Sequence, residues 1–421
     1  MDAQVGIVGA GPAGARAAER LADLGAEVVL LDPRAPWEKP CGGGLTAAAL
    51  DKVPDLAGAL PGARRIDSVR LESGASAVEV PLERPLYVLA RTALGVWQLD
   101  RARAAGASLE PDSVRRVERV PGKGWRLETA DGGSLRVRLL VGADGAASRV
   151  RKSVAPELDI ELAPARVAFA PGAGVTPSSI GLRFFRAVDG YAWDFPRPDH
   201  RSIGVGVAPG TWARARMDAE VDRYWSDLGR CGCVYADRAG AVIGTAARPL
   251  GWRYVLLAQS DYALLGDAAG FADPATGEGI PNAIRSADFL ARAFERDGSF
   301  ASYPRLAVDH LEHEFAVARR VRRILYDGSL AARLIELATA HRWAYALLAT
   351  VVNGGNAHDP SFIGHLGHEW RRAARVTGGE RVRDPAESGR RQPAAGPSPA
   401  EQDSAGHTCA PAGSCACSHD P

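Results

Sequence analysis

The hydrophobic positions at the start of the chain follow two different periods. Residues 4–9 form an apolar run with the length of a buried strand, and residues 15–24 repeat apolar side chains at the spacing of a helix face. Gly25 ends that helix, and a second apolar run follows at 27–32. Glycines within 9–14 join the first strand to the helix. The pattern predicts a strand, a tight turn, a helix and a second strand.

The same two periods predict strands and helices over the rest of the chain. We expect a short helix near 45–52, strand-like alternation over 66–90, a helix over 91–106, and strands near 113–120, 124–129 and 134–141. Further strands are expected at 167–170, 180–187, 191–195 and 202–208, with a helix at about 218–228. A strand over 262–266 precedes a long helix from Pro281, and amphipathic helices continue to about 376.

The first turn has the spacing Gly-x-Gly-x-x-Gly. Gly9 fits a tight turn, Gly11 lets the backbone approach a pyrophosphate, and Gly14 allows close packing of helix and strand. The positive end of the helix then faces the phosphate charge. Asp32, at the end of the second strand, is placed to accept hydrogen bonds from the adenosine ribose hydroxyls. This unit predicts a dinucleotide cofactor and leaves FAD and NAD open.

A second signal favours FAD. The strand at 262–266 leads into Asp267, whose carboxylate would hold the ribityl hydroxyls of a flavin with its adenosine end at the first turn. Gly-Glu-Gly-Ile at 277–280 then opens a helix with Pro281 at its first position. The positive N-terminus of that helix would face the pyrimidine edge of the flavin and stabilise its anionic reduced form.

These elements predict an α/β protein. We expect a Rossmann-type FAD-binding domain, an inserted and mostly antiparallel β-sheet substrate domain, and C-terminal helices. The expected segments are 1–160 for the first part of the FAD-binding domain with inserted strands at 66–90, 161–257 for the substrate domain, 258–300 for the second part of the FAD-binding domain, 301–376 for a helical region, and 377–421 for a tail. The tail is rich in Pro, Gly, Ser and charge, which predicts disorder.

Composition excludes several other classes. The 51 basic and 50 acidic residues give a net charge of +1, which argues against nucleic-acid binding. No apolar window is long enough for a spanning helix. Met1 and Asp2 lead directly into the first strand, leaving no room for a signal peptide, and the six cysteines do not form a disulfide framework. We therefore expect a cytoplasmic protein.

The tail contains a group of side chains of metal-binding types. It consists of three cysteines and two histidines, namely Cys409, Cys415, Cys417, His407 and His419. These side chains could bind a soft metal. Reduced thiols in a disordered segment are the preferred interpretation, and no metal site is predicted.

Further motifs carry a resemblance. With Gly-Ala-Asp-Gly at 142–145 between the two glycine sets, the chain resembles the flavoprotein group of aromatic hydroxylases, flavin halogenases and squalene epoxidases. Within that group, Lys-Pro-Cys-Gly-Gly at 39–43, Tyr-Ala-Trp-Asp-Phe-Pro at 191–196 and Asp-Pro-Ala-Thr-Gly-Glu-Gly-Ile at 273–280 resemble the geranylgeranyl reductase family. The resemblance covers roughly residues 1–376.

The resemblance implies a set of FAD contacts beyond Gly9, Gly11 and Gly14. They are Ala13, Asp32, Cys41, Gly42, Gly44, Arg91, Val114, Asp144, Asp267, Gly279 and Ile280. Arg91 opens a predicted helix, where its charge could meet the pyrophosphate. The family usually has an Asp four residues later, where this chain has Gly95.

Three side chains are candidates for the chemistry and the substrate. Cys41 lies in a glycine run that would let the backbone approach a flat ring system. Beside a flavin its thiol could deliver a proton or stabilise a cation, whereas elsewhere it would be a small apolar filler. Tyr191 and Trp193 alternate along one strand, so both rings face the same side. The resemblance makes them a wall of a lipid-accepting cavity, and the alternative is that they belong to the core.

The predicted function is the FAD-dependent saturation of carbon–carbon double bonds in an isoprenoid chain. The first alternative is a monooxygenase or halogenase of the same fold, although halogenases are expected to carry Trp-x-Trp-x-Ile-Pro where this chain has residues 191–196. The second alternative is a non-catalytic prenyl-binding carrier. Such a carrier would not need both glycine sets, which are intact here.

The electron donor and the location are expectations of the same kind. The Gly-Val-Gly at 204–206 lies within one predicted strand without a following helix, so we expect no second nucleotide-binding domain. Transient NADPH or a small redox protein such as reduced ferredoxin would then reduce the flavin. Because a prenyl lipid dissolves in membranes, we expect peripheral contact with the inner membrane surface. The apolar stretch at 343–349 is a candidate for that contact, with a core helix as the alternative.

Overall fold

The first sheet contains the predicted strand–turn–helix–strand unit. The computed structural model describes residues 2–171, 178–228, 238–245, 249, 251–326 and 330–353. Within them, seven strands pair in the order β6-β2-β1-β9-β8-β7, with β15 also pairing β9. The strands are β1 (Ala3–Val8), β2 (Val28–Leu31), β6 (Ser108–Glu110), β7 (Val114–Val120), β8 (Gly124–Thr129), β9 (Ser134–Gly142) and β15 (Tyr262–Leu264). Because β6, β2, β1, β9 and β15 are parallel, the predicted Rossmann-type sheet is confirmed.

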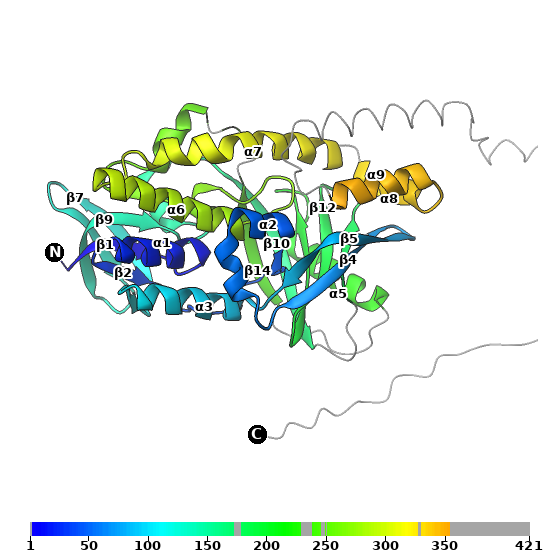
Figure 1. Cartoon of the computed structure of the whole chain (residues 1–421), viewed down its shortest axis with the longest axis horizontal. Helices are drawn as coiled ribbons and strands as arrows, with labels where there is room; N and C mark the ends of the chain where they lie inside the picture. Colours follow the sequence, from blue (N-terminus) through cyan, green and yellow to red (C-terminus); the bar gives the residue numbers. More distant parts are fainter. Residues whose placement is uncertain are drawn as a thin grey trace, which may run out of the picture. The chain divides into compact units, whose positions relative to one another are not determined.

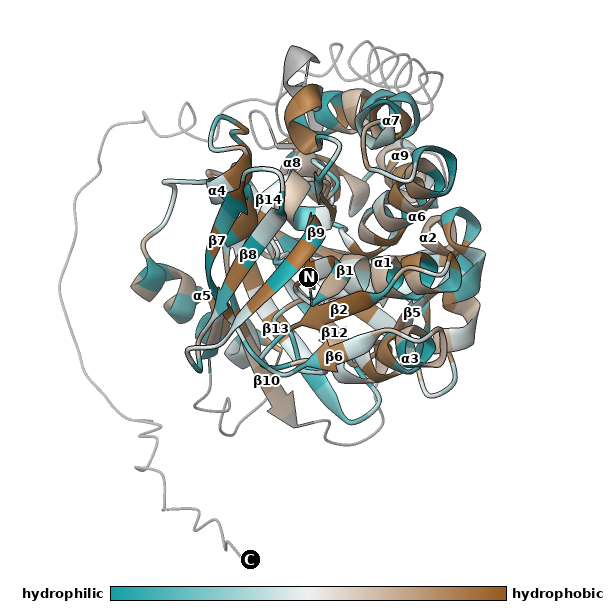
Figure 2. Ribbon diagram, turned by 90° about the vertical axis from the view of Figure 1, so that its left-hand side faces the viewer, coloured by the Kyte–Doolittle hydropathy of each residue, from teal (hydrophilic) through white to brown (hydrophobic). Residues whose placement is uncertain are grey.

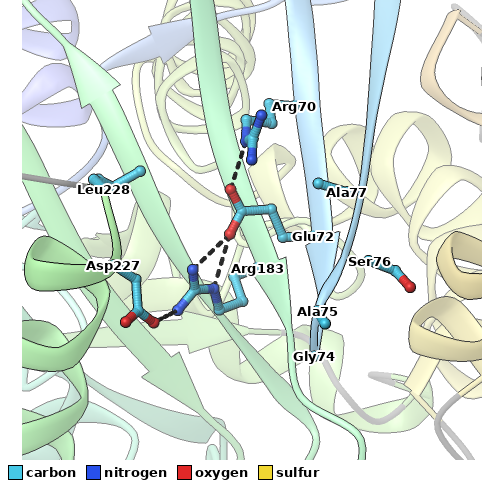
Figure 3. A pocket seen from close by; sticks show the side chains of 9 residues that line it. All are labelled: Arg70, Glu72, Gly74, Ala75, Ser76, Ala77, Arg183, Asp227 and Leu228. Atoms are coloured by element: carbon cyan, nitrogen blue, oxygen red, sulfur yellow. Dashed lines mark hydrogen bonds and ion pairs between the residues drawn. The ribbon is translucent and has the colours of Figure 1, made fainter. Parts of the chain in front are cut away.

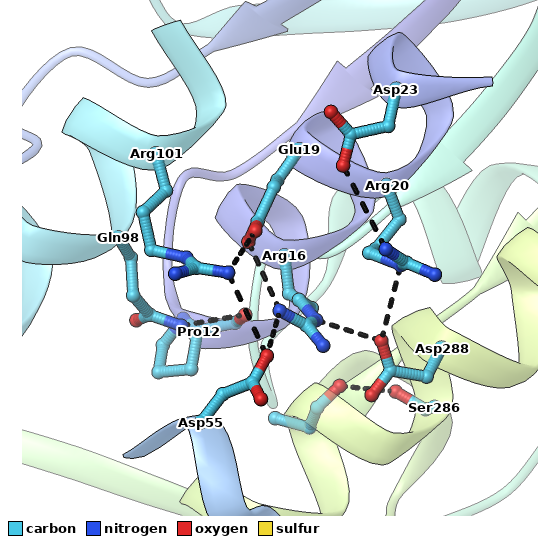
Figure 4. A network of polar contacts seen from close by, with 11 residues as sticks. Pro12, Arg16, Glu19, Arg20, Asp23, Asp55, Gln98, Arg101, Ser286 and Asp288 are labelled. Carbon is cyan, nitrogen blue, oxygen red and sulfur yellow. Dashed lines mark hydrogen bonds and ion pairs between the residues drawn. The ribbon is translucent and has the colours of Figure 1, made fainter. Parts of the chain in front are cut away.

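The helix α1 (Pro12–Asp23) packs between α3 (Arg91–Ala104) and α6 (Ile280–Asp297) (Figure 1). It begins at Pro12, three residues before the predicted start, because proline is favoured at the first helical position. Arg16 on α1 joins Asp55 and Asp288, while Glu19 accepts a hydrogen bond from Arg101 of α3 (Figure 4). These ion pairs fix α1 against segments that are far apart in sequence.

The second sheet contains eight strands within the described residues, in the order β14-β10-β13-β12-β11-β4-β5-β3. They are β3 (Gly44–Leu45), β4 (Arg64–Ser73), β5 (Ser76–Val88), β10 (Glu161–Pro171), β11 (Ser179–Phe184), β12 (Gly190–Pro196), β13 (His200–Val207) and β14 (Arg238–Thr245). Only the β4–β11 pairing is parallel among these described strands. The inserted strands of 66–90 therefore extend the sheet formed by the predicted substrate domain. The domain boundaries themselves stay a prediction.

Helices cover both faces of the second sheet. α5 (Arg214–Asp227) packs Met217, Val221 and Tyr224 against apolar residues of β12 and β13. α8 (Leu330–Ala338) and α9 (Arg342–Asn353) pack against β4 and β5. The side chains of Leu347 and Leu348 are buried there, which favours the core-helix interpretation of 343–349 over membrane contact.

The remaining helical segments pack on the helices and strands already described. They are α2 (Ala47–Lys52), α4 (Arg149–Val154), α7 (Tyr303–Tyr326) and the short 3-10 turns η1 (Pro54–Ala59), η2 (Gly251–Leu257) and η3 (Gly266–Ala269). Figure 2 shows hydrophobic residues along β2, while α6 and α7 alternate between hydrophobic and hydrophilic positions. No helix in the described ranges combines the length and apolarity needed to span a bilayer.

Several predicted boundaries were wrong. α5 begins at Arg214 rather than near 218, and the strand expected at 180–187 ends at Phe184. The short helix α4 and the strand β14 were not predicted. The helices expected beyond Asn353, the tail at 377–421 and its cysteines lie outside the described residues.

Candidate functional site

The three glycines of the first turn have different surroundings. Gly9 has φ of +96°, and a Cβ there would come within 2.4 Å of the Ala143 carbonyl oxygen. A Cβ on Gly14 would lie 1.8 Å from the Gly9 carbonyl oxygen, so the close packing of α1 on β1 requires glycine. A Cβ on Gly11 would meet no described atom within 4 Å. Gly9 and Gly14 are therefore needed by the fold, and Gly11 leaves backbone accessible at the start of α1.

Asp32 follows β2 and faces the same turn. Its Oδ2 accepts a hydrogen bond from the Ala10 backbone N–H at 2.9 Å. Its Oδ1 accepts from the N–H groups of Arg34 at 2.9 Å and Ala35 at 3.1 Å. The half-buried carboxylate thus holds the glycine turn and the following loop in place, beside the position predicted for the adenosine ribose.

The structure brings the second glycine set next to the first. A Cβ on Gly266 would lie 3.2 Å from the Cβ of Ala13, so η3 packs directly on the start of α1. Asp267 then faces α6, because its Oδ1 is 3.0 Å from the position of a Cβ on Gly279, the N-cap of that helix. Lys39 Nζ lies 3.5 Å from the other oxygen of Asp267. Two segments separated by about 250 residues in the sequence therefore lie next to each other, as the predicted FAD site requires.

Ile280 is the first residue of α6, and its side chain is buried with Leu45, Leu89 and Leu94. This side chain belongs to the core, so any contact with a cofactor would come from its backbone. The first turn of α6 has no side-chain cap, which leaves the positive end of an 18-residue helix beside Asp267.

Cys41 is held at both its thiol and its carbonyl group. Arg91 Nη1 donates a hydrogen bond to Cys41 Sγ at 3.2 Å. The Cys41 carbonyl oxygen accepts from Ser202 Oγ at 2.8 Å and from the Arg197 guanidinium. A Cβ on Gly42 would lie 2.4 Å from the ring of Phe195, so within the chain the flat ring against this glycine is Phe195. The glycine run is thereby explained by packing on β12, as well as by any cofactor.

Arg91 is buried at the start of α3, with 8% of its surface exposed. The backbone N–H groups of Arg91 and Thr92 each donate a hydrogen bond of 3.0 Å to the Glu38 carboxylate. Glu38 thereby caps the start of α3. The Nε of Arg91 has no hydrogen-bond partner among the described residues. A buried guanidinium N–H without a partner is costly, and an anionic group such as a pyrophosphate would satisfy it.

Three aromatic side chains alternate along one face of β12, and we call Tyr191, Trp193 and Phe195 the aromatic face. Tyr191 Oη donates to the Thr276 carbonyl oxygen at 3.0 Å, at the loop before α6. Trp193 is 5% exposed, which agrees with the core interpretation for this ring. Tyr191 and Phe195 are half-buried and remain accessible.

The glycines at 204 and 206 belong to β13, as the sequence predicts. Gly204 pairs directly with Trp193, and a Cβ on Gly204 would lie 2.2 Å from the indole ring. The indole Nε1 donates to Ser202 Oγ at 3.3 Å. The pair of glycines thus makes room for Trp193 and is not a phosphate-binding turn.

Asp144 and Val114 have structural roles in the described residues. Asp144 accepts hydrogen bonds from the backbone N–H groups of Arg149 at 2.6 Å and Val150 at 3.1 Å, so it caps α4. Val114 is buried at the start of β7 and pairs with Thr129. Their contacts with FAD stay predictions.

Two further residues near Cys41, Glu38 and Arg197, were not predicted from the sequence. The side chain of Arg197 is fully buried, and it forms an ion pair with Glu38. Burial lowers the pKa of Arg197 to about 10. The sequence does offer one indication of a role for Arg197, because this residue directly follows the Phe-Pro pair of the motif at 191–196. Both residues tie the Cys41 loop to the β12–β13 hairpin.

Glu278 lies in the Gly-Glu-Gly-Ile segment at 277–280 and is not among the predicted site residues. Thr46 Oγ1 donates to its Oε1 at 3.4 Å. Burial and the repulsion from Asp273 raise the pKa of Glu278 to about 7. A carboxyl group that titrates near neutral pH inside a candidate site is a functional candidate.

A separate cavity of about 540 Å³ lies between the β4–β5 hairpin and the end of α5 (Figure 3). Its buried Glu72 accepts hydrogen bonds from Arg183 at 2.7 Å and 2.9 Å, and Arg183 also pairs with Asp227. None of the predicted site residues lines this cavity. In the part of the chain that the structure describes, no cluster of three or more His, Cys, Asp or Glu side chains is placed to hold a metal ion.

Comparison with known proteins gives several extensive matches. The chain is 31% identical over 340 residues to digeranylgeranylglycerophospholipid reductase 1 of Methanopyrus kandleri, which covers 75% of this chain and 87% of that protein. It is 31% identical over 338 residues to geranylgeranyl diphosphate reductase of Rhodobacter capsulatus, covering 76% and 83% of the two chains. A menaquinone reductase of Mycobacterium tuberculosis is 28% identical over 352 residues, covering 77% and 84%. No family model matches the chain.

Solved structures share the fold. A geranylgeranyl bacteriochlorophyll reductase-like protein of Thermoplasma acidophilum superimposes with a TM-score of 0.69 at 18% identity, covering 90% of this chain and 98% of that one. A flavin-dependent brominase gives a TM-score of 0.61 at 15% identity, covering 89% and 99%. The fold is therefore shared by a reductase-like protein and a halogenase, so the fold alone does not distinguish these two classes. The relatives at 31% identity, matched over most of both chains, show that this chain belongs to the geranylgeranyl reductase family of oxidoreductases.

Proposed function

We propose that the protein is an FAD-dependent reductase that saturates carbon–carbon double bonds of an isoprenoid chain. The observation that carries this proposal is family membership together with the contact between Ala13 and Gly266, which joins the two glycine sets into one site. The halogenase alternative has a similar fold but lacks support at comparable sequence identity.

The described residues fit FAD. The accessible backbone at Gly11 and the positive end of α1 suit the pyrophosphate, as does the unpartnered Nε of Arg91. Asp32 would hold the adenosine ribose, and Asp267 the ribityl chain. When bound and reduced, FAD would supply a hydride to one carbon of the double bond. Gly42, Gly44, Gly279 and the backbone of Ile280 would line the flavin, and Val114 and Asp144 are further proposed contacts.

The aromatic face suits an apolar chain. Tyr191 and Phe195 are half-buried on the side of β12 that faces both the Cys41 loop and the loop before α6. Burial of each methylene contributes about 0.8 kcal/mol, so a long prenyl chain needs few polar contacts. The names of the relatives offer geranylgeranyl diphosphate, a digeranylgeranyl glycerophospholipid and menaquinone as substrate classes.

Cys41 is proposed to contact the flavin or the substrate. Because Arg91 donates to its sulfur, the thiol is fixed on the side of a buried cation. This arrangement orients the sulfur and places it beside a positive charge. The Arg91 guanidinium and the Cys41 sulfur would act together at the same edge of the site.

The electron donor and the membrane contact belong to the proposal as well. The β13 strand at 204–206 supports a donor that visits transiently, either NADPH or a small redox protein such as reduced ferredoxin. An isoprenoid lipid would be collected from a membrane surface by peripheral contact. Leu347 and Leu348 are used for packing on the sheet, so this contact would involve other residues.

Two observations test the proposed function. The purified protein should be yellow with a flavin spectrum, and a colourless protein that binds prenyl chains would support a carrier instead. Deletion of the gene should raise the unsaturation of one isoprenoid pool in the host, each lost reduction leaving a lipid lighter by two hydrogen atoms. Unchanged isoprenoid masses in the deletion strain would contradict the proposed activity.

A further inference from the structure

The loop before α6 carries a carboxyl group between the proposed cofactor site and the aromatic face. Glu278 directly precedes Gly279, the N-cap of α6, and a Cβ on Gly279 would lie 3.0 Å from Asp267 Oδ1. Two residues before Glu278, the Thr276 carbonyl oxygen accepts the hydrogen bond from Tyr191 at 3.0 Å. A Cβ on the intervening Gly277 would lie 3.9 Å from Tyr191 Oη. Glu278 therefore lies in the loop that connects the proposed cofactor site to the aromatic face.

Among the residues that the structure describes, no cation forms an ion pair with the Glu278 carboxyl group. Thr46, the N-cap of α2, donates to Glu278 Oε1 at 3.4 Å. Lys52, on the same helix, interacts with Glu278 at a distance, but its Nζ lies 2.7 Å from Glu314 of α7. A further charged neighbour in the described part of the chain is Asp273, which repels a second carboxylate.

Protonation follows from these surroundings. Burial, followed by the repulsion from Asp273, raises the pKa of Glu278 from 4.5 to about 7. Burial, together with the nearby carboxyl groups of Asp273 and Glu278, raises the pKa of Tyr191 to about 12. The Tyr191 hydroxyl therefore stays protonated at neutral pH. An acid whose pKa lies near the working pH is both protonated and able to release its proton. Of Glu278 and Tyr191, the carboxyl group of Glu278 meets both conditions.

We propose that Glu278 is the proton donor of the alkene reduction, a role that rests on the function proposed above. The π bond breaks, and one carbon forms a C–H bond with the hydride, which brings both electrons and leaves the flavin oxidised. The other carbon forms a C–H bond with the proton that leaves the Glu278 carboxyl group. The resulting carboxylate accepts hydrogen bonds from Thr46 and takes a new proton from water.

Glu278→Gln removes the acidic proton but keeps an oxygen that accepts the hydrogen bond from Thr46. The variant therefore tests proton donation without loss of this hydrogen bond. The FAD-loaded variant is reduced with dithionite without oxygen and mixed with geranylgeranyl diphosphate or menaquinone, and reoxidation of the flavin is followed. We expect the rate to fall by about 10²–10⁴-fold, with the flavin content unchanged. In the wild type, the rate should decline above about pH 7, and this decline should be absent in the variant.

Two further variants control this experiment. Glu278→Asp retains an acid on a shorter side chain and should recover part of the rate. Glu295→Gln, at the exposed far end of α6, should behave as the wild type. A Gln variant that reduces the alkene at the wild-type rate, with the wild-type pH profile, would overturn the proposal.

A second readout does not use turnover. The infrared carbonyl band of a protonated carboxyl group should titrate near pH 7 in the wild-type protein and be missing from Glu278→Gln. A band that persists unchanged in the variant would overturn the assignment to Glu278. Failure of the proposed function is distinguishable, because the wild-type enzyme would then reduce none of the probe alkenes while the infrared band still titrates.

Discussion

In the first turn, one glycine is required by the packing of the fold, and another is free of packing contacts and is proposed to serve the cofactor. A Cβ on Gly14 would overlap the Gly9 carbonyl oxygen, whereas a Cβ on Gly11 would meet no described atom. Overpacking of this kind costs about 1–3 kcal/mol. We therefore expect Gly14→Ala to lower the free energy of unfolding by that amount, measured by urea denaturation of the FAD-free protein.

Gly11→Ala is the matched variant and should leave the unfolding free energy of the FAD-free protein unchanged. It should weaken FAD binding, measured by quenching of flavin fluorescence, because the methyl group occupies the approach to the backbone at the start of α1. Wild-type FAD affinity in Gly11→Ala would show that the pyrophosphate lies elsewhere.

Glu278 also predicts a pH dependence of stability. Its pKa is higher in the folded protein, at about 7, than the ordinary 4.5, so the folded state binds the proton more tightly. Its stabilising contribution is therefore complete below about pH 4.5 and is lost as the pH rises through 7. Compared with Glu278→Gln, the wild type should lose more thermal stability between these values. Parallel curves for the two proteins would contradict the raised pKa.

At the scale of elements, Glu38 joins α3 to the β12–β13 hairpin. It caps α3 and pairs with the buried Arg197. Removal of one partner from a buried ion pair costs about 3–5 kcal/mol, because the other charge is left uncompensated. We expect Glu38→Ala to lose about this much unfolding free energy in urea, and Glu83→Ala, on an exposed part of β5, to lose little. Equal stability of the two variants would rule out the linking role of Glu38.

The elements that the sequence predicted well have local signals at their ends. Pro12 and Gly25 mark the limits of α1, and the alternation of Tyr191 and Trp193 marks β12. β14 was missed because its small residues give little periodic signal, and it is stabilised by pairing with β10. Pairing of this kind depends on the fold and not on the local sequence.

The same distinction applies to the site. Gly9, Gly11 and Gly14 can be recognised in the sequence by their spacing alone. Arg197, in contrast, contacts Cys41 although the two residues are 156 positions apart in the sequence. No local pattern encodes that contact, so the residues that position the Cys41 loop became visible only in the folded chain. The reason for Gly42 was likewise incomplete, because the sequence did not reveal that Phe195 packs against it.

At the scale of the whole molecule, the proposed cofactor spans two segments that lie far apart in the sequence. A ligand that binds only the folded state at 100 times its Kd stabilises it by about 2.7 kcal/mol. FAD should therefore raise the unfolding temperature of the FAD-free protein more than FMN, which lacks the adenosine that contacts the first turn. Asp267→Ala should reduce the gain, and equal effects of FAD and FMN would contradict a site that includes both segments.

The proposed function requires that reduced flavin in this protein saturates an alkene without oxygen. The most direct measurement incubates the dithionite-reduced, FAD-loaded enzyme with geranylgeranyl diphosphate or menaquinone under nitrogen and determines the product by mass spectrometry. We predict a gain of two hydrogen atoms per reduced bond and no requirement for oxygen. An unchanged substrate under nitrogen, with a product that contains added oxygen once air is admitted, would contradict the reductase and identify a monooxygenase.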